Sequence, residues 1–400
     1  MRNFLAMLIP HNRPQAPSLS SNQEEVQETT PYGVPPAANS LGHLRCLRSL
    51  DAARATGQPI LLLFQGIPGS ASSIAFGNLV SRDPLLIEVL ETIFAPCVIA
   101  PTSTNPAVRS KFRERAGNTP VAYVLDPTTL TPLVPRIDGV MDARRLVQSI
   151  LHGLVGRAVP PWVDYLAVAH SLRLVRKDSV LAVVETVQVE HATFAAGCPW
   201  VGETVFGMVA GVVMTQPGWC DGHGVVVVEF DPVVVSYEQL VRAAVAAGLE
   251  PMVHDDTQLQ EAMVVCEDRV TVRDRRVVVD GVEELKPLAR ASDANSKYHL
   301  KSMAPDAALL PLTELQQAHC HSRLGTRETK SDVLQRVLTP RQAGLLRRID
   351  AVGGAAVLKP HMRGKSPTGN CMSDLLHALV SSEVACASLQ ASFLRPSSSL

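Results

Sequence analysis

Four consecutive valines within Gly224–Phe230 (GVVVVEF) constrain the fold of this 400-residue chain more than any other feature. β-Branched side chains favour extended backbone, so this segment predicts a buried strand. Asp231-Pro232 closes the strand. Ser236 is then a suitable N-cap for a helix over Tyr237–Ala247, because its hydroxyl can accept a hydrogen bond from an N–H of the first turn.

The segments before this strand complete the predicted order of one domain. Val180–Glu190 is β-branched and predicts a strand, Thr204–Val209 predicts a helix, and Gly211–Thr215 begins another strand. The glycines of Gly218–Gly222 predict a tight turn. A strand, helix, strand, strand, helix order over residues 178–285 indicates an α+β domain of the split-βαβ, ferredoxin-like kind.

The preceding block, residues 41–157, predicts an α/β layer because its strands alternate with helices. The expected strands are Pro59–Gln65, Ala95–Pro101, Thr119–Leu125 and, beside the last, Leu133–Ile137. The expected helices are Ser73–Ser81, Leu85–Phe94 and the amphipathic Asp142–Gly156.

Composition describes the remaining parts of the chain. Residues 1–40 are rich in Pro, Ser, Asn, Gln and Glu and predict a disordered lead-in. Residues 286–351 predict a helical extension, in which Thr339 is the N-cap and Pro340 the first residue of a helix to Ile349. Residues 352–400 are expected to be a loosely ordered tail.

Charge and cysteine usage exclude several classes of protein. Lys and Arg (37) nearly balance Asp and Glu (38), which argues against a nucleic-acid partner. The sequence contains no apolar stretch of the roughly 18 residues that a membrane span needs. The eight cysteines are widely spread without a CxxC pair, which favours cytoplasmic thiols over a disulfide framework. We expect no metal and no organic cofactor.

Cys198 is the residue with the clearest chemical potential. It follows Gly197 after a strand and precedes a predicted helix, whose positive end and unpaired N–H groups favour a thiolate. Trp200, Trp219 and Pro199 could wall a small apolar pocket for a methyl or thioether group. A buried structural thiol is the alternative that these residues alone leave open.

The surrounding motifs are similar to the A-type peptide methionine-(S)-sulfoxide reductases. The similarity is carried by Gly197–Glu203 (GCPWVGE), by a Gly-Trp turn at 218–219, and by a long stretch over 223–240 (HGVVVVEFDPVVVSYEQL). That family has a G-C-F-W-x-x-E element, a G-Y-T-G-G turn, a G-H-x-E-x-V strand, and then Y-D-P and S-Y-x-x-L. The order and spacing agree over about 50 residues, or an eighth of the chain.

This resemblance implies a role for several residues. Cys198 would attack the sulfoxide sulfur and become a sulfenic acid, Trp200 would line the methyl pocket, and Glu203 would be mainly structural. Trp219 replaces a tyrosine of the family, and Pro199 replaces a phenylalanine.

Three further assignments from the family remain open alternatives. The loop that carries the family's proton-donating glutamate is shortened here to Cys220-Asp221-Gly222, so Asp221 either substitutes for it or only makes the turn. Asp255, in a stretch similar to H-D-P-T-Q-L, either belongs to the active-site network or starts a helix at Thr257. Cys220 is the nearest resolving thiol or an incidental one.

The block 41–157 resembles the thioredoxin-like superfamily, on the strand PILLLFQ, the turn Gly66–Ser73 (GIPGSASS) and Thr119-Pro120. The turn is similar to a V-P-G-(selenocysteine or Cys)-x-x-T signature, with Ser70 at the redox position. Since a hydroxyl has no thiolate chemistry, this block is expected to be a scaffold or docking surface without redox activity, or to keep Ser70 in a binding role.

Together these features predict a reductase of peptidyl or free methionine-(S)-sulfoxide in protein repair under oxidative stress, with thioredoxin or a small thiol as reductant. The alternatives are a degenerate binding or redox-sensor protein with an oxidisable Cys198, and a redox enzyme acting on a peroxide or a disulfide. His319-Cys320-His321 is interpreted as a surface cluster, because three adjacent residues of a helix cannot converge on one ion. Ser296–Leu300 (SKYHL) and the rest of the extension receive no chemical role.

Overall fold

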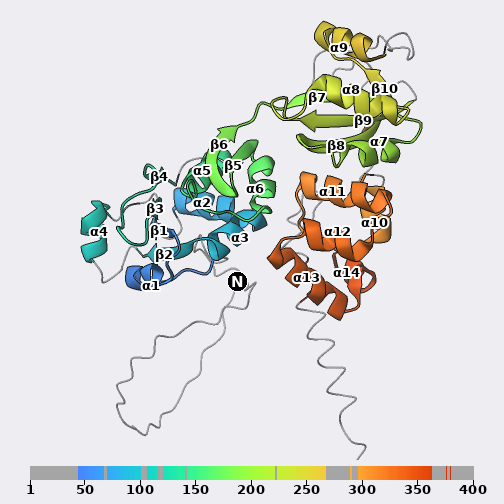
Figure 1. The fold of residues 1–400 in the computed structure, drawn as a ribbon. Helices are drawn as coiled ribbons and strands as arrows, with labels where there is room; N and C mark the ends of the chain where they lie inside the picture. Colours follow the sequence, from blue (N-terminus) through green and yellow to red (C-terminus); the bar gives the residue numbers. More distant parts are fainter. Residues whose placement is uncertain are drawn as a thin grey trace, which may run out of the picture. The chain divides into compact units, whose positions relative to one another are not determined.

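The structure is a computed structural model. It describes residues 44–66, 70–100, 106–115, 117, 120–139, 142–220, 223–266, 289–290 and 296–362, and the single positions 375 and 379. The mixture of helices and separate sheets confirms an α/β chain with more than one domain (Figure 1). In the described part of the chain, no helix has the length and apolarity needed to cross a membrane.

The first sheet has the order β2-β1-β3-β4. Its strands are β1 (Ile60–Phe64), β2 (Ala95–Ile99), β3 (Val121–Leu125) and β4 (Ile137–Asp138), with β2 parallel and β3 antiparallel to β1. The accompanying helices are α1 (Leu50–Ala55), α2 (Ala71–Ser81), α3 (Pro84–Thr92), α4 (Pro106–Phe112) and α5 (Ala143–His152). The predicted alternation of strands and helices is therefore confirmed, and the more specific thioredoxin-like assignment stays a prediction.

Both faces of this sheet are buried, which explains the continuous apolar run of β1. Leu61 and Leu63 belong to one core cluster, whereas Ile60, Leu62 and Phe64 belong to another on the opposite face. The edge strand β4 is shorter than the predicted Leu133–Ile137, because Ile137 and Asp138 pair with β3 whereas Pro132 adds only an isolated bridge to Leu125.

A hairpin follows where the sequence predicts a domain boundary. Helix α6 (Val163–Ala169) leads into β5 (Leu172–Lys177) and β6 (Val180–Thr186), which pair with each other. Leu172, Leu181 and Val184 share a core with Leu146 of α5. The boundary expected at residue 178 thus falls inside a hairpin, and the strand predicted at Val180–Glu190 packs with the first sheet's core rather than opening the next domain.

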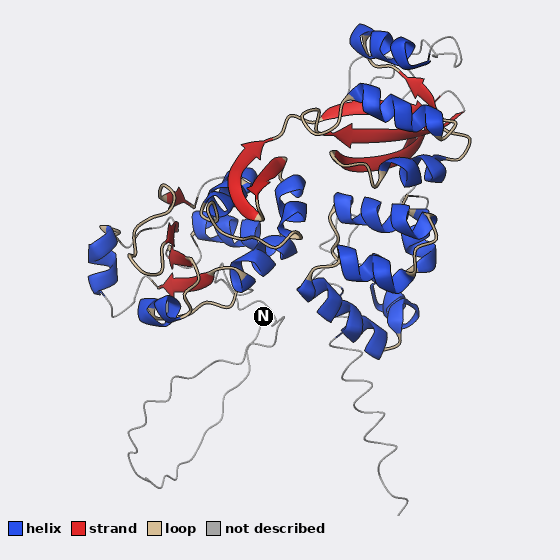
Figure 2. Cartoon of the chain, in the orientation of Figure 1, coloured by secondary structure: helices blue, strands red, loops and turns tan. Residues whose placement is uncertain are grey.

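The second sheet has the order β10-β7-β9-β8-β11 and is antiparallel throughout. Its strands are β7 (Glu190–Ala195), β8 (Val212–Cys220), β9 (His223–Phe230), β10 (Glu250–Met252) and β11 (Ala289–Arg290). Its helices are α7 (Pro199–Phe206), α8 (Tyr237–Ala246) and α9 (Asp256–Cys266). Figure 2 shows the strands in red with these helices beside them.

The valine run forms the centre of this sheet as predicted. Val226, Val228 and Phe230 of β9 point into the core under the helices, and Val225 points to the other face. Ser236 caps α8 with its side chain on the backbone N–H of Gln239, which confirms the predicted helix start. The turn predicted at Gly218–Gly222 is wrong in part, because residues 218–220 continue β8 and pair with β9.

The remaining described helices lie mainly in the predicted helical extension, but the last, α14 (Gly354–Met362), falls in residues 352–400, where the prediction of a loosely ordered tail is wrong because Ala355 and Leu358 pack into the helical core. They are α10 (Tyr298–Met303), the 3-10 helix η1 (Ala307–Leu309), α11 (Glu314–Gly325), α12 (Lys330–Val337), α13 (Pro340–Ala351) and α14 (Gly354–Met362). Thr339 caps α13 and Pro340 is its first residue, as the sequence predicts. These helices bury their own core, which includes Leu324, Val333 and Leu345.

Candidate active site around Cys198

Cys198 lies at the junction between β7 and α7. Its backbone is extended (φ −133°, ψ 115°), and its carbonyl oxygen accepts the N–H of Val201 at 3.0 Å, so it is the N-cap residue. Pro199 follows at the first helical position, where its missing N–H costs no hydrogen bond. The predicted helix at Thr204–Val209 therefore begins five residues earlier than expected, directly after the cysteine.

The thiol of Cys198 is half-buried, unlike most other cysteines that the structure describes. Burial raises the pKa of Cys46 and of Cys320 to about 12, that of Cys97 to about 11, and that of Cys266 above its ordinary value. Those four thiols stay protonated and unreactive at neutral pH. Cys198 combines partial exposure with a position at a helix N-terminus, which favours a nucleophile.

Helix α7 is held against the sheet by close backbone contacts. A Cβ at Gly224 would lie 2.8 Å from the Pro199 ring, and a Cβ at Gly202 would lie 2.6 Å from a methyl group of Val226. At the far end of the helix, Phe206 stacks on Phe194 of β7 with ring centroids 4.5 Å apart. The position of Cys198 is thus fixed by a rigid strand–helix unit, and Pro199 is buried against β9.

Trp200 faces the helical extension. Its ring stacks on Tyr298 of α10, with centroids 4.5 Å apart and planes 14° from parallel. Its carbonyl oxygen accepts hydrogen bonds from Nε2 of His321 at 3.1 Å and from the Thr204 hydroxyl at 3.0 Å. Trp200 is the second residue of α7 and therefore lies in the first turn of the helix, which directly follows Cys198.

Glu203 is fully buried and paired with a fully buried lysine. Nζ of Lys297 donates to Oε1 of Glu203 at 2.6 Å, and the Lys297 backbone N–H donates to Oε2 at 3.2 Å. The same Nζ also donates to the carbonyl and hydroxyl oxygens of Thr215 on β8. Burial raises the pKa of the Glu203 carboxyl, and the Lys297 ammonium acts against that rise. Glu203 is therefore a structural anchor between α7, β8 and α10.

Trp219 of the predicted turn and Cys220 of the predicted shortened loop lie on opposite faces of the sheet. Trp219 pairs with Gly224, which meets Pro199, so its side chain is on the face that α7 covers; it is 47% exposed. Cys220 is the next residue and packs with Ala195, Val225 and Met252 on the other face. Asp221 lies outside the described residues.

Asp255 caps a helix. Its carboxylate accepts the Gln258 backbone N–H at 2.8 Å, and the Gln258 side-chain oxygen accepts the His254 N–H at 3.1 Å. The bond from Gln258 to the Asp255 carboxylate is that of an N-cap, here at the start of α9. His254 contacts the Thr193 hydroxyl through Nε2 at 2.9 Å, which ties this corner to β7.

Ser70 also caps a helix. Its side chain accepts the Ser73 N–H at 3.3 Å at the start of α2, and its hydroxyl donates to the Ser73 hydroxyl at 2.9 Å. Residues 67–69 of the resembled redox turn, and Thr119, lie outside the described part. The serine at the redox position therefore caps the start of α2.

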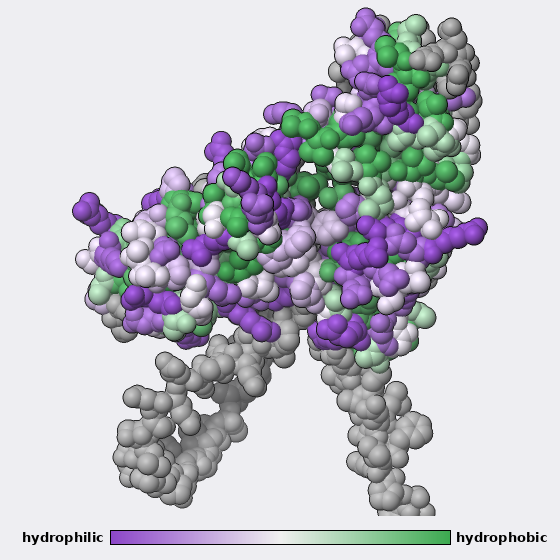
Figure 3. All heavy atoms as spheres, in the orientation of Figure 1, coloured by the Kyte–Doolittle hydropathy of each residue, from purple (hydrophilic) through white to green (hydrophobic). Residues whose placement is uncertain are grey.

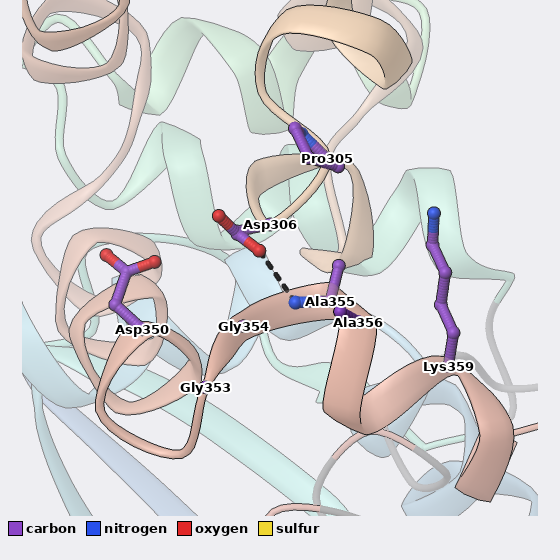
Figure 4. A pocket seen from close by; sticks show the side chains of 8 residues that line it. All are labelled: Pro305, Asp306, Asp350, Gly353, Gly354, Ala355, Ala356 and Lys359. Carbon is purple, nitrogen blue, oxygen red and sulfur yellow. Dashed lines mark hydrogen bonds between the residues drawn. The ribbon is translucent and has the colours of Figure 1, made fainter.

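Two cavities are present away from Cys198. One, of about 330 Å³, is lined mostly by apolar residues such as Val187, Met208 and Val212. Figure 3 shows apolar residues, drawn in green, gathered on the face in view. The other, of about 580 Å³, lies at the start of α14, where an Asp306 oxygen accepts the Ala355 N–H at 2.6 Å (Figure 4). Neither cavity is lined by Cys198. Within the described ranges, no three His, Cys, Asp or Glu side chains are grouped as a metal site.

Sequence reasoning missed the contribution of the helical extension. The interpretation of His319-Cys320-His321 as a surface cluster is wrong: Cys320 is fully buried in the core of the helical extension, and His321 is fully buried where α11 packs on α7. Lys297 and Tyr298, to which no chemistry was assigned, contact Glu203 and Trp200. In the sequence, the charged and aromatic residues of SKYHL (296–300) were the feature that could have indicated these contacts.

Comparisons with known proteins find two similar sequences. No family model matches the chain. It is 40% identical over 92 residues to the peptide methionine sulfoxide reductase MsrA of Geobacter metallireducens, a match that covers 19% of this chain and 53% of that protein. It is 41% identical over 69 residues to the peptide methionine sulfoxide reductase MsrA 1 of Nostoc sp., which covers 13% of this chain and 42% of that protein.

This chain contains an MsrA-type region. The chain spans about half the length of the MsrA proteins it matches. The extension that contacts α7 adds groups whose role must be argued from the geometry.

Proposed function

We propose that this chain reduces methionine-(S)-sulfoxide, peptide-bound or free, with Cys198 as the nucleophile. The thiolate attacks the sulfoxide sulfur, and the S–O bond breaks as the oxygen is protonated and passes to the cysteine. A thiol and a sulfoxide thus become a sulfenic acid and a thioether. A second thiol then condenses with the sulfenic acid and releases water, and a dithiol reduces the resulting disulfide.

The observation that carries the proposal is the partly exposed Cys198 at the N-terminus of α7, with Trp200 in the first turn of the same helix. The MsrA likeness of the chain agrees with this chemistry. Trp219, on the α7 face of the sheet, is our candidate for a second wall of the methyl site. Asp221 and Asp255 are candidate proton donors, and Cys220 is the candidate resolving thiol.

The deciding experiment measures turnover of dabsyl-methionine-(S)-sulfoxide with dithiothreitol for the wild type and for Cys198→Ser. We expect turnover in the wild type and a loss of more than about a thousandfold in the variant, because a serine hydroxyl is not a nucleophile at neutral pH. Cys46→Ala, a thiol outside the MsrA-type region, is the matched control and should turn over like the wild type.

Two other outcomes would replace the proposal. Loss of one thiol per chain without turnover would favour the degenerate redox sensor, and activity on hydrogen peroxide alone would favour a peroxide-reducing enzyme. Cys220→Ser tests the resolving step separately from the attack on the sulfoxide. With limiting thioredoxin, the steady-state turnover of this variant should fall. The amount of thioether that it forms in the first turnover should not.

We also propose that the first α/β unit is a thioredoxin-like scaffold or docking surface without redox chemistry. The strand order β2-β1-β3-β4 and Ser70 at the start of α2 support this reading. In this view the protein is a cytoplasmic repair enzyme of oxidative stress that uses thioredoxin or a small thiol. A Ser70→Cys variant tests the idea, since restored disulfide reductase activity toward insulin would indicate a preserved redox turn.

A further inference from the structure

Two successive residues of the helical extension, Lys297 and Tyr298, contact α7, and the next residue, His299, is bonded to His321, which itself bonds to the Trp200 carbonyl. Lys297 has a left-handed backbone (φ 53°) and is held by Glu203 through both its N–H and its Nζ. The His299 N–H donates to Nδ1 of His321 at 3.2 Å. Tyr298 lies between these two fixed residues, so its position over Trp200 is set by its neighbours on both sides.

From this geometry we propose that Tyr298 is a substrate-contacting residue of the Cys198 site and forms the outer aromatic wall for the sulfoxide's methyl group. The inference rests on the proposed function, because it assumes that a sulfoxide reaches Cys198. Pro199 supplies no aromatic surface, since it is buried against Gly224. Tyr298 is 42% exposed and stacks on Trp200, which lies in the first turn of α7 after Cys198, so the proposal places the tyrosine ring at this end of the helix.

The chemistry of the ligand suits such a wall. A methyl group bonded to a sulfoxide sulfur carries a partial positive charge, and aromatic faces attract positively polarised groups and sulfur. The contact that the structure contains is made by the ring of Tyr298 and not by its hydroxyl. We therefore assign Tyr298 a binding role that phenylalanine can fill, and no part in proton transfer.

The test compares Tyr298→Ala, Tyr298→Phe and Met303→Ala in steady-state turnover of a methionine-(S)-sulfoxide peptide. Met303 is the matched control, because it is exposed at the other end of the same short helix. We expect the alanine variant at position 298 to raise KM about tenfold with kcat within about twofold, the loss of one aromatic contact. Tyr298→Phe and Met303→Ala should keep the wild-type KM.

Two results would overturn the assignment. If Tyr298→Ala keeps the wild-type KM, the ring does not touch the substrate. If Tyr298→Phe raises KM as much as the alanine variant does, the hydroxyl and not the ring makes the contact. Circular dichroism of each variant checks that α7 and α10 still fold.

A second measurement separates this inference from the proposed function. Fluorescence polarisation of a fluorescein-labelled methionine-(S)-sulfoxide peptide on Cys198→Ser measures binding without reaction. If the wild type shows no turnover but Tyr298→Ala weakens this binding about tenfold, the proposed reaction fails and the Tyr298 site stands. If turnover is present and Tyr298→Ala changes neither the peptide's affinity nor KM, the proposed reaction is supported and the proposed contact of Tyr298 with the substrate is wrong.

Discussion

The buried lysine at position 297 shows how one side chain ties distant parts of this chain together. It pairs with Glu203, 94 residues earlier, and both are fully buried. The sequence pointed to Cys198, Trp200 and Glu203, because they form one local motif. It gave no sign of the partner of Glu203, because a pairing over 94 residues depends on the tertiary fold.

Lys297→Met is expected to destabilise the protein by about 3–5 kcal/mol, because it leaves the Glu203 carboxylate buried without its cation. The double variant Lys297→Met with Glu203→Gln should recover more than half of this loss, since a neutral amide costs less to bury. Urea unfolding at pH 7 measures both. Arg242→Met, which breaks an exposed pair with Glu238 on α8, is the control and should cost less than about 1 kcal/mol. A loss equally small for Lys297→Met would show that the pair is not buried in solution.

Helix α7 illustrates which elements a sequence specifies. The capping residues Ser236 and Thr339 were predicted correctly, because an N-cap is a local hydrogen bond between neighbouring residues. The start of α7 was missed because Pro199 and Gly202 weaken a helical pattern. In the structure, the proline occupies the first helical position and the glycine allows close contact with β9.

Gly202→Ala should therefore destabilise the chain, in contrast to the usual effect of alanine in a helix. The added Cβ would lie 2.6 Å from a methyl group of Val226, and the shift of α7 that relieves this contact costs roughly 1–3 kcal/mol. Gly344→Ala in α13 is the control: its Cβ meets only the tip of Arg347, so it should stabilise by up to about 1 kcal/mol. Thermal unfolding measures both changes. Equal effects of the two substitutions would contradict the close packing of α7.

At the scale of the whole molecule, the domain boundaries were the least predictable feature. A boundary at residue 178 followed from the composition of Val180–Glu190, yet β6 belongs with β5 and with the core around Leu146. Similarly, the helical extension was separated from the MsrA-type region, although His321 of α11 hydrogen bonds to α7. Local patterns identify strands and helices, whereas the choice of packing partner depends on complementary surfaces that no short window contains.

The His321 contact makes the stability of the molecule depend on pH. Burial is the main cause that lowers the pKa of His321 to about 4, and the neighbouring His299 and Lys297 add to it. Its Nε2 donates to the Trp200 carbonyl, while Nδ1 accepts the His299 N–H, so a second proton has no acceptor. The unfolded chain, with an ordinary histidine pKa near 6.5, takes up this proton more readily than the folded chain.

The lowered pKa of His321 makes the folded chain less stable at acidic pH. Stability from a lowered histidine pKa is fully present above pH 6.5 and is lost as the pH falls toward 4. Between pH 7 and pH 5, this one residue should cost about 2 kcal/mol of unfolding free energy. Urea unfolding at pH 7 and at pH 5 gives the loss of unfolding free energy for the wild type and for His321→Asn. The difference between these two losses is the contribution of His321. His152→Asn, at an exposed position of α5, is the control and should leave the wild-type loss unchanged. A His321→Asn variant with the full wild-type loss would show that the junction between α7 and α11 is hydrated, and the anchoring of Tyr298 would then rest on Lys297 alone.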